Sequence, residues 1–335
     1  MKKQMQAMVI NEFGGPNIFQ AVQVPRPEVR AGHVLIRVAA SSVNPHDYNV
    51  RKGAAPPAIA PAFPAILHGD VAGTIEEVGE GVTAFHRGDE VYACAGGVKG
   101  TSGALADYML ADADLVAPKP KSLSMTQAAA LPLVALTAWE GLIDRAQMYA
   151  GQTVLVHGAT GGVGHLAIQL AKARGARVFA TASTTEKARI AQALGADVAI
   201  EYHTQSVAEY VAEYTGGKGF DIVFDSVGGA NFAQSVEATA PRGTIISIVP
   251  NATLDLSLLL FKGLSLHTVF TYVPLLYGMG RAAHGRILTE LAKLVDEGKV
   301  CPLIDEHTFA LREVAAAHQF LESGRALGKV VLVNS

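Results

Sequence analysis

Residues 153–249 show a regular alternation of apolar and amphipathic segments. Each short apolar segment is typical of a buried strand, and each is followed by a stretch with apolar residues at helical spacing. The pattern predicts strands at 153–157, 177–181, 197–201, 221–225 and 244–249, separated by helices at 163–174, 186–194, 206–214 and 231–240. Such alternation is typical of a parallel sheet covered by helices on both faces, so we expect an α/β fold with a doubly wound sheet.

The chain before about residue 125 has a different character. Residues 33–38, 71–78 and 90–93 alternate apolar and polar side chains, and turn-forming segments separate them. Short strands at this spacing predict a small β-barrel or sandwich. Together with a length of 335 residues, the change of pattern indicates two domains. A final apolar segment at 328–333 is expected to form one more strand.

A glycine-rich loop lies at the first strand–helix junction of the alternating region. Residues 158–164 read Gly-Ala-Thr-Gly-Gly-Val-Gly, and Gly162, Gly164 and Ala167 match the G-x-G-x-x-G/A fingerprint of dinucleotide-binding folds. Glycines let the backbone turn tightly and approach a pyrophosphate, while the N-terminus of the following helix attracts its negative charge. The residues expected to hold the dinucleotide are Thr160, Gly161, Gly162 and Val163. A glycine turn needed only for packing is the alternative.

The segment after the second predicted strand favours NADP over NAD. An NAD site of this type usually has Asp or Glu about 20 residues after the glycines, where the carboxylate bonds the ribose 2′-hydroxyl. Residues 180–187 instead carry small and hydroxyl side chains, and Ser183 and Lys187 are suited to bond a 2′-phosphate. Two alternatives stay open, because Glu186 would serve a 2′-hydroxyl if it pointed inward, and Lys187 would otherwise be a solvated helix charge. We expect NADP(H) as the cofactor.

The sequence offers no convincing metal site. Zinc prefers clustered Cys and His ligands, but the two cysteines, Cys94 and Cys301, lie far apart in the chain. A second set of candidates lies closer together but lacks a thiolate: His46, Asp47, His68 and Asp70. We therefore expect no metal.

Composition limits the partners and the compartment. The net charge is −3, from 27 basic and 30 acidic residues without a basic cluster, so we expect no nucleic-acid partner. No apolar run approaches the roughly 20 residues of a membrane span, and no signal peptide is credible. Two distant cysteines fit a reducing compartment, so we expect a cytoplasmic protein. An edge strand at 264–269 predicts a homodimer that forms through that strand.

Six segments spread over nearly the whole chain carry a family resemblance. They are Ser41–Asp47, Gly69–Gly73, Gly88–Tyr92, Gly158–Gly164, Gly195–Asp197 and Gly328–Leu332. Through them the chain resembles the medium-chain dehydrogenase/reductase superfamily, and within it the zinc-independent quinone oxidoreductase branch that includes zeta-crystallin-like proteins.

This resemblance implies a domain plan and bears on zinc. It implies a GroES-like β-barrel catalytic domain at residues 1–125, completed by 271–335, and a Rossmann NADP-binding domain at 126–270. In the zinc-bearing alcohol dehydrogenases of the superfamily, a Cys stands at the position of Asn44, a His at about Gly69 and another Cys near Leu133. None of these three ligands is present here.

The resemblance also implies positions around the cofactor. Asn44 matches a position at the nicotinamide end of the active site, and Thr137 matches a threonine beside the nicotinamide. Ser183, Lys187 and Tyr202 match the 2′-phosphate site. The remaining positions implied to line the cofactor site are Val227, Ser247, Ile248, Val249, Val269 and Phe270. One position departs from the pattern, because Asn49 stands where many quinone oxidoreductases have an active-site tyrosine.

The implied activity is NADPH-dependent, zinc-free hydride transfer to a small electrophilic substrate, either a quinone or an α,β-unsaturated carbonyl. Asn44 would be the catalytic residue, donating a hydrogen bond to the oxygen on which negative charge develops. A loop amide that bonds its own backbone is the alternative for Asn44. Two further readings of the whole chain stay open: a zinc-type alcohol dehydrogenase with unusual ligands, and a non-catalytic NADPH-binding protein of crystallin-like or RNA-binding type.

Overall fold

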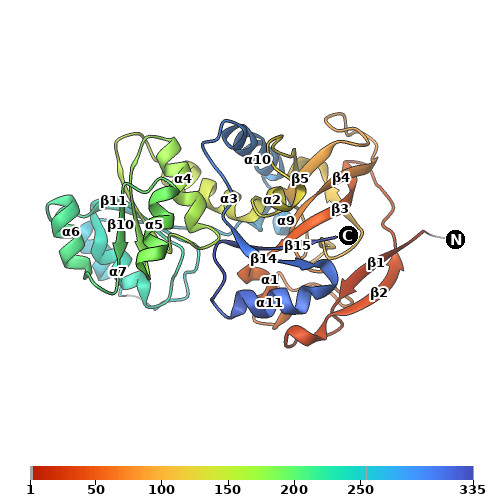
Figure 1. The fold of residues 1–335 in the computed structure, drawn as a ribbon, viewed down its shortest axis with the longest axis horizontal. Helices are drawn as coiled ribbons and strands as arrows, with labels where there is room; N and C mark the ends of the chain where they lie inside the picture. Colours follow the sequence, from red (N-terminus) through yellow and green to blue (C-terminus); the bar gives the residue numbers. More distant parts are fainter. Residues whose placement is uncertain (1–2, 254, 335) are drawn as a thin grey trace. The chain divides into compact units, whose positions relative to one another are not determined.

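The computed structural model describes residues 3–253 and 255–334 (Figure 1), which form two compact units. The first unit comprises the chain up to Leu133, Tyr272–Gly298 and the chain from Pro302 onward. The second comprises Val134–Thr271 and Lys299–Cys301. The first unit runs past the expected boundary at residue 125, because helix α2 (Met125–Ala129) packs on strands of that unit. Within the described ranges, no helix is long and apolar enough to cross a membrane.

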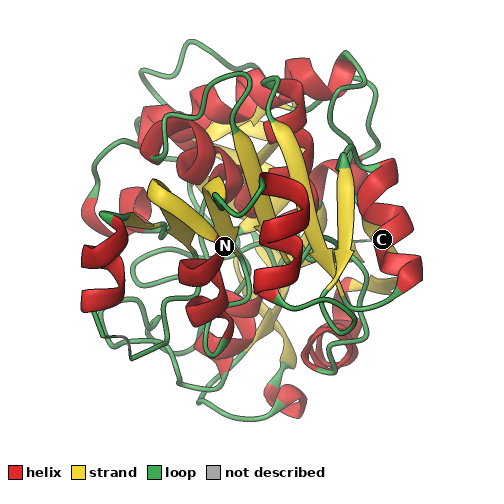
Figure 2. Cartoon of the chain, turned by 90° about the vertical axis from the view of Figure 1, so that its left-hand side faces the viewer, coloured by secondary structure: helices red, strands yellow, loops and turns green. Residues whose placement is uncertain are grey.

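The second unit contains a six-stranded sheet in the order β10-β9-β8-β11-β12-β13, and every pair in it is parallel. Its strands are β8 (Thr153–His157), β9 (Arg177–Ala182), β10 (Val198–Glu201), β11 (Phe220–Asp225), β12 (Thr239–Ser247) and β13 (Ser265–Thr268). The helices between them are α4 (Gly164–Ala173), α5 (Thr185–Ala193), α6 (Val207–Thr215), α7 (Asn231–Ala238) and α8 (Ser257–Lys262). Figure 2 shows helices on both sides of the strands.

This arrangement confirms the predicted doubly wound α/β fold. The chain first adds strands outward from β8 through β9 to β10, then returns to add β11, β12 and β13 on the other side of β8. Ligands of such sheets bind at the carboxyl ends of the strands, where the order reverses. The inner strands are mostly apolar because both faces of the sheet are covered. Leu155, Phe179 and Val223 have no exposed surface and pack in one core cluster. The unit also contains most of α3 (Pro132–Trp139) and a π-helical turn at Glu140–Arg145.

The first unit is built mainly on antiparallel strands, and only β14 and β15 pair in parallel within its described residues. Its main sheet has the order β14-β15-β3-β4-β5-β7, with β6 also paired to β3, and a separate hairpin joins β1 and β2. The strands are β1 (Gln4–Val9), β2 (Gln20–Pro25), β3 (His33–Val43), β4 (Asp70–Val78), β5 (Glu90–Cys94), β6 (Tyr108–Asp112), β7 (Val116–Pro118), β14 (Ile304–Ala310) and β15 (Lys329–Val333). The helices that follow the strands are α1 (Pro45–Arg51), α9 (Val273–Tyr277), α10 (Arg281–Asp296) and α11 (Val314–Glu322).

The C-terminal strand returns to the first unit. β15 pairs antiparallel with β3 on one side, while β4 pairs with β3 on the other. Val330 lies opposite Val43 in this register, which brings Lys329 next to the end of β3. Three segments far apart in sequence therefore meet where β3 ends and α1 begins.

Candidate functional site

The carboxyl ends of the parallel strands in the second unit form one edge of the sheet, because all six strands run in the same direction. Most of the expected cofactor residues follow these ends directly. They are Thr160–Val163 after β8, Ser183 after β9, Tyr202 after β10, Val227 after β11, Ser247–Val249 at the end of β12, and Val269 and Phe270 after β13. Residues that are spread over about a hundred positions of sequence are thus collected at one sheet edge.

The loop after β8 requires glycine at two points. Gly158 has φ +79°, in the left-handed region. A Cβ added to Gly164 would lie 2.0 Å from the carbonyl oxygen of Gly158, so no side chain fits there. Gly161 donates its N–H to Gly158, whereas the N–H groups of Gly162 and Val163 meet no acceptor among residues 3–253 and 255–334. A tight loop with free N–H groups at the start of α4 fits a pyrophosphate.

The ends of β9 and β10 lie side by side. Ala182 is in register with Glu201, and the N–H of Tyr202 donates to the carbonyl oxygen of Ala182 at 3.3 Å. Ser183 and Tyr202 therefore both follow directly from a paired position, and Tyr202 is 45% exposed.

Helix α5 begins immediately after this point and carries the expected cation. The Thr184 hydroxyl caps the helix by accepting the N–H of Lys187 at 3.2 Å. The cap places Lys187 in the first turn, where its side chain is partly exposed. Glu186 is exposed in the same turn, and the end of β9 itself carries no carboxylate.

A buried carboxylate shapes the loop after β11. Asp225 has no exposed surface, and one of its oxygens accepts the N–H groups of Val227 and Gly228, each at 2.9 Å. The other oxygen accepts the hydroxyl of Ser235 at 3.1 Å. These bonds hold the backbone in a turn that leaves Val227 51% exposed at the sheet edge.

The remaining expected positions of this unit differ in exposure. The hydroxyl of Ser247 is buried, and the carbonyl oxygen of Ser247 accepts the N–H of Val269 at 3.2 Å. Phe270 is 43% exposed. Thr137 in α3 is nearly buried, and its hydroxyl lies 2.8 Å from that of Thr271.

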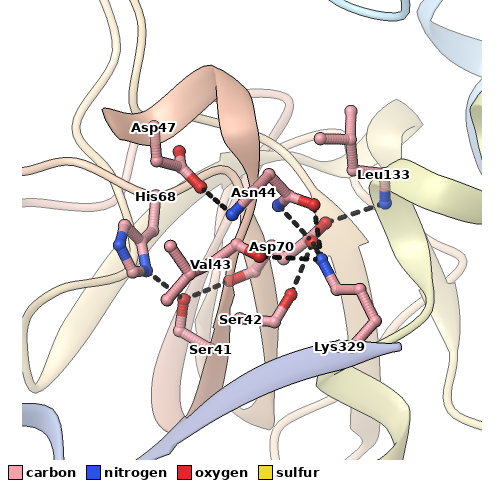
Figure 3. A network of polar contacts seen from close by, with 9 residues as sticks. All are labelled: Ser41, Ser42, Val43, Asn44, Asp47, His68, Asp70, Leu133 and Lys329. Atoms are coloured by element: carbon pink, nitrogen blue, oxygen red, sulfur yellow. Dashed lines mark hydrogen bonds and ion pairs between the residues drawn. The ribbon is translucent and has the colours of Figure 1, made fainter. Parts of the chain in front are cut away.

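Asn44, the expected catalytic residue, lies in the first unit at the centre of a buried polar network (Figure 3). Its side chain is 1% exposed. The amide nitrogen donates to Asp70 at 2.8 Å, and the amide oxygen accepts a hydrogen bond from Lys329. The alternative expectation for Asn44 was an amide bonded to its own backbone. Both contacts instead join the amide to the side chains of other residues.

Asp70 and Lys329 complete this network. Asp70 also accepts the Ser42 hydroxyl at 2.7 Å and the N–H of Leu133 at 2.8 Å. Lys329 donates to the carbonyl oxygen of Val43 at 3.1 Å and lies 3.5 Å from Asp70. Burial lowers the pKa of Lys329, while the carboxylate of Asp70 acts in the opposite direction. The two charges are buried as a pair, with each group hydrogen-bonded to further partners.

Asp47 is a second carboxyl group at this site. It accepts the backbone N–H of Asn44 at 2.8 Å from the first turn of α1. Burial raises the pKa of Asp47 to about 7, and the nearby Asp70 adds to this effect. Burial therefore disfavours the charged form of this carboxyl group.

Each of the four residues considered as metal candidates is hydrogen-bonded to, or stacked on, other residues of the chain. His46 stacks on Tyr272 at 4.1 Å between ring centroids, and Asp47 bonds Asn44. One ring nitrogen of His68 lies 3.1 Å from the Ser41 hydroxyl oxygen, and the other lies 2.9 Å from a ring nitrogen of His318. Asp70 belongs to the network of Asn44. In the part of the chain that the structure describes, no group of three or more His, Cys, Asp or Glu residues is placed to hold a metal ion.

Gly69, at about the position where the resemblance implies a zinc-binding histidine in the alcohol dehydrogenases, lies in crowded surroundings. A Cβ on Gly69 would lie 2.9 Å from the Tyr272 hydroxyl and 3.0 Å from the sulfur of Cys94. Burial also raises the pKa of Cys94, which disfavours the thiolate form that binds metals.

Sequence reasoning did not identify Ser42 or Lys329 as part of a site. Asp70 was considered only as a metal ligand. The available signal was a lysine at the start of an otherwise apolar strand, in Gly328-Lys329-Val330-Val331-Leu332, because a charge in such a strand needs a buried partner.

Comparison with known proteins agrees with both units. Residues 30–121 match the alcohol dehydrogenase GroES-like domain, and residues 194–332 match the zinc-binding dehydrogenase family. A solved alcohol dehydrogenase superfamily protein from Novosphingobium aromaticivorans is 41% identical, with a TM-score of 0.94 over 99% of this chain and 100% of that one.

Two curated relatives are enzymes. The chloroplastic NADPH-dependent alkenal/one oxidoreductase of Arabidopsis thaliana is 33% identical over 98% of this chain and 80% of its own length. The human quinone oxidoreductase is 31% identical over 99% of this chain and 98% of its own. With the sheet order, the glycine loop and these near-complete matches in view, the chain belongs to the medium-chain dehydrogenase/reductase superfamily, in its quinone oxidoreductase-like branch of nicotinamide-dependent oxidoreductases.

Proposed function

We propose that this protein transfers a hydride from NADPH to a quinone or an α,β-unsaturated carbonyl, without zinc. The observation that carries the proposal is the end of β9. There the N–H of Ala159, in the glycine loop after β8, donates to the carbonyl oxygen of Thr181 in β9 at 3.1 Å. Ser183 follows β9 directly, Lys187 lies in the first turn of α5, and the end of β9 carries no carboxylate to repel a 2′-phosphate. The relative from Arabidopsis thaliana is named for NADPH and for alkenals and alkenones, and the human relative for quinones.

Different groups of residues bind different parts of the cofactor. The N–H groups of Gly162 and Val163, with Thr160 and Gly161, bind the pyrophosphate at the start of α4. Ser183, Lys187 and Tyr202 hold the 2′-phosphate. The residues that line the rest of the nucleotide are Asn44, Thr137, Val227, Ser247, Ile248, Val249, Val269 and Phe270. When bound, NADPH supplies the hydride.

Asn44 supports the reaction at the substrate oxygen. A substrate without a metal to polarise it must already be electrophilic, and conjugation in quinones and enones provides this. The nitrogen of Asn44 carries two N–H groups, of which the structure directs one to Asp70. The second N–H donates to the oxygen on which negative charge develops, which stabilises the transition state.

The partner of this chain is a second copy of itself. β13 is an edge strand of the sheet, and Leu266 within it is 39% exposed. The neighbouring α8 leaves Leu260 74% and Phe261 82% exposed, an unusual amount of apolar surface for one short helix. Pairing of β13 with its copy would satisfy the edge and cover these side chains. Leu266→Lys should convert a dimer to a monomer in light scattering, and a wild-type monomer would contradict the pairing.

The test of the function is NADPH oxidation in the presence of quinones, enals and enones. We expect turnover with at least one activated acceptor, and none with saturated ketones or simple alcohols. Activity that requires stoichiometric zinc would instead support an alcohol dehydrogenase. Tight NADPH binding with no turnover of any acceptor would support a non-catalytic role and contradict the proposal.

A further inference from the structure

We propose that Lys329 and Asp70 are positioning residues that hold the amide of Asn44 in one orientation, so that its second N–H stays available to the substrate oxygen. This inference deepens the proposed function and rests on it. We call the three residues the amide clamp.

The chemistry of the partners fixes which end of the amide faces which residue. An ammonium group can only donate hydrogen bonds, and an ionised carboxylate can only accept them. Lys329 must therefore face the amide oxygen, and Asp70 must face the amide nitrogen, as the structure has them. Rotation of the amide by half a turn would set two donors against the ammonium and an oxygen against the carboxylate. The clamp thus excludes the flipped state electrostatically.

The two charged residues are themselves held in place. Ser42 and the N–H of Leu133 bond Asp70, and the carbonyl oxygen of Val43 accepts from Lys329. Asp70 is fully buried and Lys329 is 2% exposed, so neither can exchange its partner for bulk water.

The clamp is also fixed by three adjacent strands. Asn44 follows β3, Asp70 begins β4 and Lys329 begins β15, and β3 lies between the other two. In addition, Asp47 accepts the backbone N–H of Asn44, so the main chain of Asn44 is held as well as its side chain. Such immobilisation before the substrate arrives is what a hydrogen-bond donor needs in order to stabilise developing charge without reorganising.

The test is a mutant cycle on kcat. The double variant Lys329→Met with Asp70→Asn removes both charges together, because loss of one would leave the other buried and unpaired. We expect it to lower kcat for an enone roughly as much as Asn44→Ala does, on the order of 100-fold, with KM and NADPH affinity changed far less. Combining all three substitutions should then lower kcat no further than Asn44→Ala alone.

A merely structural role predicts a different result. Losses that multiply in the combined variant, or a double variant with unchanged kcat, would overturn the clamp. The exposed pair Lys293 and Glu290 provides a matched control, and Lys293→Met with Glu290→Gln should leave kcat unchanged.

A second readout needs no turnover. In protein with ¹⁵N-labelled asparagine, the side-chain signal that disappears in Asn44→Ala belongs to Asn44. The proton bonded to the carboxylate of Asp70 should resonate downfield in the wild type and move upfield in the double variant. An unmoved signal would overturn the clamp. A moved signal in a protein that reduces no acceptor would support the clamp and defeat the proposed function, so that the two failures are told apart.

Discussion

The sheet edge of the second unit and the amide clamp of the first unit are built from different kinds of chemical group. The sheet edge uses backbone N–H groups, glycines and small hydroxyl side chains that end consecutive strands, and Val227, Tyr202 and Phe270 there remain 43–51% exposed. The clamp uses two opposite charges and an amide, with exposed fractions of 0–2%. The sheet edge is therefore partly open to solvent, whereas the charged groups of the clamp are bonded to one another inside the protein.

The two sites depend on different interactions. Backbone geometry around Gly158 and Gly164 shapes the loop at the sheet edge, and a Cβ added at Gly164 would clash with the carbonyl oxygen of Gly158. The clamp depends on charge balance in the interior, where an unpaired ion costs several kcal/mol. Substitutions at the edge should therefore change binding, and substitutions in the clamp should change stability as well as rate.

Among the substitutions considered, Lys329→Met should destabilise the protein most. Loss of the ammonium leaves the buried carboxylate of Asp70 without its charge partner. We expect the free energy of unfolding to fall by about 3–5 kcal/mol. Chemical denaturation measures this directly, and the double variant with Asp70→Asn should recover much of the loss. Equal stability of the single and double variants would mean that the two charges are not coupled.

The next effect is expected at the sheet edge, from Gly162→Val. A branched side chain beside the N–H groups at the start of α4 would block the approach of a pyrophosphate. We expect NADPH affinity to fall by roughly 100-fold, about 3 kcal/mol, with an unchanged melting temperature. Calorimetric titration and a thermal melt check the two parts. Retained NADPH affinity would show that the pyrophosphate binds elsewhere.

The fold was largely predictable from the sequence, for a physical reason. In the second unit, period and local turn chemistry determine the elements, and β8 spans the predicted residues 153–157 while α4 differs by one residue at each end. β12 begins at Thr239, before the predicted residue 244, because Thr239 pairs with Phe220 across an irregular register that apolar pattern alone does not reveal. The returning strand β15 was also predicted.

The clamp was not predictable in the same way. Asn44 was singled out by family resemblance, but its partners Asp70 and Lys329 lie 26 and 285 positions away. Local pattern carries no information on such distant pairings, which are set by the register of β15 on β3. The sheet edge needed only the rule that parallel strands end together, whereas the clamp needed the tertiary register.

An effect of intermediate size is expected on the stability of the protein at acidic pH. Burial, and to a lesser degree the charge of Lys329, lowers the pKa of His68 from 6.5 to about 3. The unfolded chain then binds a proton below pH 6.5 that the folded chain does not, so stability is lost as pH falls below 6.5. Between pH 6.5 and pH 5 this amounts to about 2 kcal/mol.

The variant His68→Gln removes this proton linkage while keeping a hydrogen-bonding side chain. Denaturation at several pH values should show a shallower loss of stability on acidification than in the wild type. His86, which is 83% exposed, provides the control, and His86→Gln should leave the pH dependence unaltered. An identical acid response in all three proteins would exclude His68 as a source of acid sensitivity.

The smallest effect is a change of cofactor preference. Lys187→Glu sets a negative charge in the first turn of α5, next to the proposed 2′-phosphate site. We expect NADPH affinity to fall about tenfold while NADH affinity stays nearly constant, because only NADPH carries the extra phosphate. Competitive titration of both cofactors checks this, and equal losses would refute the assignment of Lys187.

If the sheet edge of the second unit holds a 2′-phosphorylated nicotinamide nucleotide, the wild-type protein should distinguish NADPH from NADH. Calorimetry under the same conditions measures the affinity for each. We predict that NADPH binds at least about tenfold more tightly. Equal affinities, or tighter binding of NADH, would contradict the account.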